Sequence, residues 1–230
     1  MEVARRLQGA RLLAIDLSRV SLGYAKRRTL ALGVDNIEFG QADILELASL
    51  GRSFDVIEAV GSLQTLADPR AGWRVLSSLL RPGGFIFFGL YSEIARRDIV
   101  AARDFIARRG YGGGSADDIR RGRQELMDFE RGTPLKNVTH TTEFYNTSEC
   151  RDLLFHVQEH RTTLPEIKAD LADHGLTFVG FEIGAEAQRL YVERFAEDKA
   201  MTDLDRWHAL ETDHPLMFVA MYQFWAQRGW

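Results

Sequence analysis

Two aspartates stand where predicted β-strands end. Asp16 closes the apolar run at 11–16, and Asp43 follows the alternating run at 36–42. In an open parallel sheet, ligands bind beyond the carboxyl ends of the strands. A carboxylate at Asp16 could accept two hydrogen bonds from a ribose diol, and one at Asp43 could accept a hydrogen bond from an adenine amine. The alternative is that short acids only end strands and cap helices, and these two residues alone leave both interpretations open.

These acids need a sheet to position them, and strand and helix patterns alternate over the first ninety residues. Ser18 and the pair Asp68-Pro69 are typical helix N-caps, and Thr163 with Glu166 has the spacing of a capping box. Apolar runs joined by helices favour a mostly parallel α/β sheet covered on both faces. We expect its strands at 11–16, 36–42, 54–60, 84–90 and 177–183.

The pattern divides the chain into three parts. Residues 1–92 form a partial nucleotide-binding core, and residues 93–160 form a helical insertion that we expect to cover the carboxyl ends of the strands as a lid. Residues 161–230 complete the core with a helix and a strand and then continue as helices. The last helix is expected to open at Pro215 and to bury an apolar stripe that includes Phe224 and Trp225.

Four segments together carry a resemblance to a known family. Their order and spacing resemble the second to fifth strands of the class I S-adenosylmethionine (SAM)-dependent methyltransferases, especially bacterial ones of the type 11 and type 12 sort. The chain beyond Ser92 is similar to the methyltransferase part of some bacterial proteins that also carry tetratricopeptide repeats. The segments are Leu13-Ala14-Ile15-Asp16-Leu17-Ser18, Gln41-Ala42-Asp43-Ile44, Phe54-Asp55-Val56-Ile57-Glu58-Ala59 and Leu80-Arg81-Pro82-Gly83-Gly84.

The resemblance implies a Rossmann-like fold with SAM as the cofactor. Asp16 would bind the ribose hydroxyls, and Asp43, with the backbone at Ile44, would hold the adenine. Ala59 and Val60 would line the floor beside the methionine portion. The cofactor contacts implied in this way are Asp16, Leu17, Ala42, Asp43, Ile44, Ala59 and Val60.

The chain departs from the family pattern in two places. The family's first strand and its Gly-x-Gly-x-Gly loop are missing ahead of residue 11, and residues 2–8 resemble the helix that follows that loop. That strand would be the central one, between the runs at 11–16 and 54–60, so we expect an N-terminally truncated enzyme or a sheet closed without it. Gln64 and Thr65 replace a His-His pair of many relatives, and neither can act as a base.

Candidates for substrate contact lie further along the chain. Tyr91 and Ser92 follow the run at 84–90 and would face the mouth of the cleft; the alternative is a loop start and a helix N-cap. His156 and His160 are four residues apart and would share one face of a helix, where substrate contact competes with a plain surface role. We expect no metal site, since such a site needs three or four converging ligands, and we identify no catalytic residue.

Composition narrows the function class. The net charge of -4 argues against a dedicated nucleic-acid binder, and the single cysteine, Cys150, favours a reducing cytoplasm. The sequence shows neither a targeting signal nor a run long enough to cross a membrane.

Three functions remain after these exclusions. The first is a SAM-dependent methyltransferase acting on a small-molecule or protein acceptor. The second is a non-catalytic remnant or interaction module of methyltransferase ancestry. The third is an NAD(P)-dependent oxidoreductase, because Asp16 could also bind a nicotinamide nucleotide's ribose.

Overall fold

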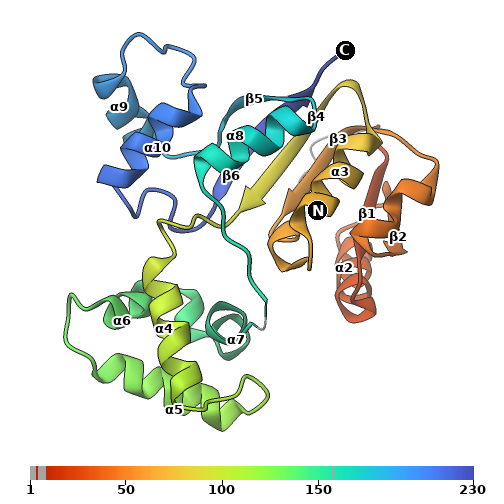
Figure 1. The fold of residues 1–230 in the computed structure, drawn as a ribbon. Coiled ribbons are helices and arrows are strands. Elements are labelled where there is room, and N and C mark those ends of the chain that lie inside the picture. The colour runs from red at the N-terminus through yellow and green to blue at the C-terminus, as the bar shows by residue number, and fades with distance from the viewer. Residues whose placement is uncertain (1–3, 5–8, 157) are drawn as a thin grey trace.

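The computed structural model describes residue 4, residues 9–156 and residues 158–230 (Figure 1). Apart from Ala4, the helix expected at residues 2–8 lies outside the described residues. Within the described part, strands and helices alternate up to Leu90 as predicted.

The first unit is a parallel pair of strands with a helix between them. β1 (Leu12–Asp16) pairs with β2 (Ile37–Gln41), and the register places Asp16 opposite Gln41. Between them runs α2 (Arg19–Ala31), whose N-cap Ser18 accepts a hydrogen bond from the Ser21 amide. A 3-10 helix, η1 (Ile44–Leu50), follows with Asp43 as its N-cap.

A second sheet of four strands holds most of the core. Its order is β3-β4-β6-β5, in which β3 is parallel to β4, and β6 is antiparallel to both β4 and β5. On the chain it begins with β3 (Phe54–Val60), η2 (Leu63–Thr65), α3 (Pro69–Leu79) and β4 (Leu80–Leu90), and it resumes with α8 (Leu164–Asp173), β5 (Leu176–Phe181) and β6 (Tyr222–Arg228).

The expectation of a helical C-terminus is wrong for its last element. Residues Tyr222–Arg228 form β6 and not a helix, although α9 (Ala185–Arg194) and α10 (Leu204–Asp213) precede it. Tyr222, Phe224 and Ala226 are fully buried and alternate with half-buried residues, which is the period of a strand. The N-cap of α10 is Asp203, whose side chain accepts hydrogen bonds from the Asp205 and Arg206 amides.

The two sheets share no ladder within the described residues. There β1 pairs only with β2, and β3 pairs only with β4. Ile15 of β1 and Ile57 of β3 nevertheless pack against one hydrophobic cluster, together with Trp73 and Phe88, whose rings stack 4.0 Å apart. The sheet is therefore divided between the strands that the family resemblance separates by one central strand.

The segment between β4 and α8 forms a separate group of helices, which we call the helical unit. It has its own hydrophobic cluster, built around Ile119, Leu126 and Phe144, and lies beyond the carboxyl end of β4 (Figure 1). Its first helix begins at Arg97, and residues 134–145 contain three short helices. The elements are α4 (Arg97–Arg108), α5 (Ala116–Asp128), α6 (Pro134–Asn137), η3 (Val138–His140), η4 (Glu143–Tyr145) and α7 (Thr147–Phe155).

No helix among the described residues is both long and apolar enough to cross a membrane.

Candidate functional site

The two strand-end aspartates lie at the ends of neighbouring parallel strands. Asp16 is the last residue of β1, and Asp43 stands two residues beyond β2. One oxygen of each carboxylate accepts a hydrogen bond from the backbone two residues later. Asp16 Oδ1 accepts from the Ser18 amide at 2.7 Å, and Asp43 Oδ1 accepts from the Leu45 amide at 2.9 Å. Local capping and ligand binding are therefore compatible, because the second oxygen of each carboxylate makes no hydrogen bond to a described residue.

The other residues expected at the cofactor follow the same edge. Leu17 is 62% exposed, and its carbonyl accepts a hydrogen bond from the Gln41 side chain at 2.9 Å. Ala59 is buried in β3, whereas Val60 at the end of that strand is 44% exposed. Ala42 and Ile44 are half-buried and pack against the core. These residues occupy the carboxyl ends of β1, β2 and β3, across the division between the two sheets.

A pocket of about 320 Å³ opens between the first turns of α3 and α8, beside the end of β4. It brings together two of the residues expected to touch substrate, Tyr91 and His160. Trp73 supplies an aromatic wall, and Glu166 and Asp170 supply carboxylates. The pocket thus combines aromatic surface with hydrogen-bond acceptors, which suits a polar organic ligand.

The structure places the other two substrate candidates elsewhere. Ser92 is completely buried, and its hydroxyl donates to Glu211 at 2.5 Å. His156 is the C-cap of α7, because that helix ends at Phe155, so His156 and His160 do not share a helix face. Neither Ser92 nor His156 is among the residues that line the pocket.

Sequence reasoning missed several residues of this region. Gln64 is only 3% exposed, lines the pocket, and accepts the His160 amide on its backbone carbonyl at 2.8 Å. Asp170 lies on the buried face of α8 beside Ile167 and Leu171. A carboxylate on the apolar stripe of a predicted helix was the signal that could have found it, and the same holds for Glu211 in α10.

Burial changes the proton affinity of Asp170. Its desolvation raises the pKa of the carboxyl group above the ordinary value, and the charge of Arg70 opposes the rise. The Arg70 Nε atom lies 3.0 Å from Asp170 Oδ1, and the Arg70 side chain is 63% exposed. Asp170 is therefore shielded from solvent and has a raised pKa, two properties that are typical of residues that accept protons at functional sites.

Glu211 is a second buried carboxylate, and it is hydrogen-bonded to the segment that follows β4. It accepts hydrogen bonds from Ser92 at 2.5 Å and from Tyr222 at 2.6 Å. Burial raises the pKa of Glu211 above 4.5, because desolvation outweighs the two hydroxyl groups and the charges of His208 and Arg97. The folded protein thus binds this proton more tightly than the unfolded chain.

This raised pKa predicts how stability depends on pH. The protonated form of Glu211 favours the fold, so its contribution falls as the pH rises from about 4.5 through the folded pKa and is constant above it. Glu211→Gln removes the titration. We therefore expect the free energy of unfolding of the variant to rise relative to that of the parent protein as the pH rises, by about 1.4 kcal/mol for each tenfold difference in proton affinity between the folded and unfolded states. Urea unfolding across this pH range measures the difference, with exposed Glu186→Gln as the charge control. A pH-independent difference would contradict the argument.

Several arginines of the helical unit are paired with acids. Arg120 and Arg121 bind Asp117 and Asp118 one turn earlier, and Arg109 lies 2.8 Å from Glu125. This supports a solvated helical face over an anion-binding one. Among the described residues, no three His, Cys, Asp or Glu side chains converge as metal ligands would.

A family model described as a methyltransferase domain matches residues 1–86. An uncharacterised protein of Synechococcus sp. is 32% identical over 75% of this chain and 43% of its own length. The ubiquinone biosynthesis O-methyltransferase of Chromobacterium violaceum is 31% identical over 41% of each chain. The chain thus spans less than half the length of these curated relatives.

Solved structures share the fold. PKMT2 from Rickettsia typhi superposes with a TM-score of 0.67 at 17% identity, covering 97% of this chain and 44% of that one. The same protein in complex with AdoHcy gives a TM-score of 0.65 at 14% identity, covering 94% of this chain and 43% of that one. The [4+2]-cyclase SpnF gives 0.51 at 14% identity, covering 99% of this chain and 69% of that one. At these identities the likeness concerns the fold alone.

Proposed function

We propose that this chain, whose residues 1–86 match a methyltransferase-domain model, is a class I SAM-dependent methyltransferase. In this proposal it binds SAM at the carboxyl ends of β1, β2 and β3 and methylates an acceptor held in the pocket beside β4. The observation that carries the proposal is the placement of Asp16 and Asp43 at the ends of two neighbouring parallel strands, each with one oxygen that accepts no hydrogen bond from a described residue.

The described residues fit the adenosine part of this cofactor. The second carboxylate oxygen of Asp16 can accept from ribose hydroxyls, and that of Asp43 can accept from the adenine amine. The exposed side chains of Leu17 and Val60 offer apolar surface beside them. For the methionine part we infer a further strand and glycine loop from ahead of residue 11, placed between β1 and β3, where the two sheets share no ladder.

When bound, SAM supplies a methyl group on a cationic sulfur. The contribution of this chain is to hold the cofactor and the acceptor in line and to keep water away. Tyr91, His160 and Gln64 would orient the acceptor from the pocket wall. Asp170 would take up a proton from an acceptor that carries one, since it combines burial with a raised pKa.

The acceptor is a small molecule or a protein side chain, and we place the reaction in the cytoplasm. The relative that is an O-methyltransferase of ubiquinone biosynthesis supports methyl transfer as the chemistry. A non-catalytic module of methyltransferase ancestry is the second candidate, and the division between the sheets favours it.

Titration calorimetry with S-adenosylhomocysteine, and with NAD as a control, tests the proposal. We expect weak binding of S-adenosylhomocysteine by residues 1–230, and tighter binding by a chain extended at its N-terminus with a strand and a glycine loop, because the loop's backbone can then approach the methionine part closely. We expect no binding of NAD by either chain.

Two results would count against methyl transfer. Binding of NAD without S-adenosylhomocysteine would favour the oxidoreductase. Failure of the extended chain to bind either ligand would favour the non-catalytic module.

A further inference from the structure

The helical unit is joined to the sheet by two short segments, residues 91–96 and residues 158–162, which we call the neck. The segments are bonded to each other: the Thr162 amide donates to the Tyr91 carbonyl, and the Glu93 amide donates to the Thr162 carbonyl, both at 2.9 Å. Among the residues that the structure describes, the hydrophobic cluster of the helical unit shares no member with the cluster that includes the sheet. The position of the unit therefore depends on what fixes the neck.

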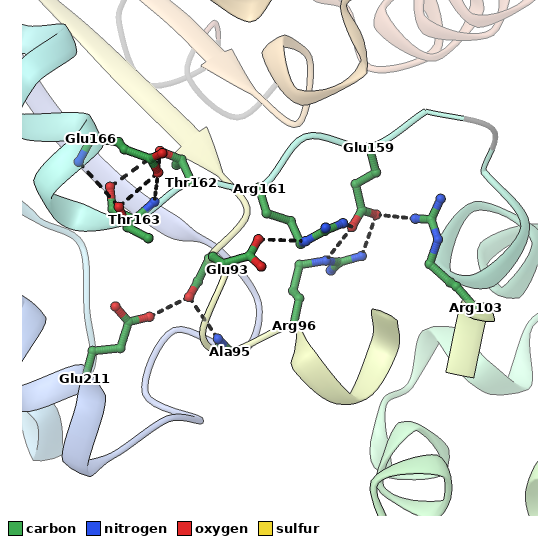
Figure 2. A network of polar contacts seen from close by, with 11 residues as sticks. Glu93, Ala95, Arg96, Arg103, Glu159, Arg161, Thr162, Thr163, Glu166 and Glu211 are labelled. Atoms are coloured by element: carbon green, nitrogen blue, oxygen red, sulfur yellow. Dashed lines mark hydrogen bonds and ion pairs between the residues drawn. The ribbon is translucent and has the colours of Figure 1, made fainter. Parts of the chain in front are cut away.

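One buried carboxylate, that of Glu159, is surrounded by the arginines of the neck and of α4 (Figure 2). The side chain of Glu159 is 3% exposed and binds Arg96 through two hydrogen bonds, at 2.8 and 3.1 Å. Arg103 of α4 donates to the same carboxylate at 2.8 Å, and Arg161 lies 3.7 Å away. Arg161 also donates to Glu93 at 3.0 Å, so the contacts cross both segments of the neck.

The same cluster reaches the pocket. The guanidinium of Arg96 lies 3.6 Å from the centre of the Tyr91 ring, and Tyr91, His160 and Arg161 all line the pocket. His160 and Arg161 directly follow Glu159 on the chain. Glu159 is therefore linked to residues of the pocket wall, through Arg96 to Tyr91 and through the chain to His160 and Arg161.

We propose that Glu159 is a positioning residue whose ion cluster fixes the angle between the helical unit and the sheet, and thereby sets the shape of the pocket. Its carboxylate is the common partner of three arginines, and without its charge they would repel one another across the neck. Bidentate pairing with Arg96 also fixes direction as well as distance. The assignment of the pocket to the acceptor rests on the proposed function, whereas the control of the angle does not.

Distance measurement between spin labels tests the control of the angle. Labels at Arg120→Cys on α5 and Ser78→Cys on α3 report it, since both positions are exposed. Native Cys150 should stay unlabelled, because it is buried and desolvation raises the pKa of its thiol to about 11. We expect a narrow distance distribution in the parent protein and a broadened one in Glu159→Gln.

Two further variants make the result specific. Glu93→Gln removes an exposed acid that binds only Arg161 in this cluster, and it should leave the distribution narrow. Arg96→Lys keeps the charge but loses the paired hydrogen bonds, so it should broaden the distribution and serves if Glu159→Gln does not fold. A narrow distribution in either folded variant would overturn the proposal.

The effect on the pocket has its own signature. The indole N–H of Trp73, in the pocket wall, should broaden or shift in the ¹H–¹⁵N spectrum of Glu159→Gln. The indole N–H of Trp207, which donates to the Met201 carbonyl at 2.8 Å inside the core, should keep its position. Equal changes at both would indicate general destabilisation and would count against a positioning role. Since the cofactor residues lie on other strands, affinity for S-adenosylhomocysteine should be unchanged, which separates this proposal from the proposed function.

Discussion

Replacing Asp16 with alanine is expected to weaken the binding of S-adenosylhomocysteine about tenfold or more. A hydrogen bond to a charged group contributes roughly 1.5–3 kcal/mol, and each 1.4 kcal/mol is about a factor of ten in affinity. Asp43→Ala should cost somewhat less, since an adenine amine offers fewer donors than a ribose diol. Titration calorimetry on the N-terminally extended chain provides the measurement.

The structure makes a sharper version of this experiment available. Asp16 Oδ1 accepts the Ser18 amide at 2.7 Å, and an asparagine can keep that bond while losing the negative charge. Asp16→Asn should therefore retain the stability of the parent protein and still lose affinity. Asp35→Ala, an exposed acid at the opposite end of β2, should leave the affinity unchanged. Wild-type affinity in Asp16→Asn would reduce Asp16 to a helix cap.

Replacing Trp207 with alanine is expected to destabilise the protein by about 3–5 kcal/mol. The side chain is 1% exposed. The centre of its ring lies 4.2 Å from the centre of the Tyr191 ring and 5.3 Å from that of the Phe181 ring. Its loss leaves a cavity in the core and a carbonyl, that of Met201, without its donor. Denaturant unfolding followed by circular dichroism measures the change.

Trp230 offers the matched control. It is 99% exposed, so Trp230→Ala should change the free energy of unfolding by no more than about 0.5 kcal/mol. Similar losses in both variants would contradict the packing argument.

Because α10 carries both Trp207 and Glu211, loosening this helix should also release Ser92 just beyond the end of β4.

The alternation of strands and helices up to Leu90 could be predicted because its signals are local. Ser18, Asp68 and Thr163 cap the helices that they were expected to cap, and the Thr163 side chain forms the capping box with Glu166. A cap depends on residues two or three positions away, and so sequence spacing is enough to predict it. The four segments that resemble the methyltransferases predicted the fold, which the solved structures share.

The C-terminal strand could not be predicted, because its apolar residues fit two periods. Phe224 and Trp225 were expected on the apolar stripe of a helix, whereas Tyr222, Phe224 and Ala226 form the buried side of β6. This segment becomes a strand because it lies between β4 and β5 and forms an antiparallel ladder with each of them. Only the tertiary structure supplies those two neighbours, since they come from residues far away in the chain.

The residues that end the strands of the proposed cofactor site follow from local sequence patterns, whereas the groups that share the pocket are brought together by the fold. Tyr91, Gln64 and Asp170 meet there from three distant stretches of the chain, and no spacing links them. The neck depends on the same kind of contact: Glu159 acts through Arg96 and Arg103, which are more than fifty residues away in sequence. Buried charges must find partners wherever the fold places them, because desolvation leaves an unpaired charge too costly to keep.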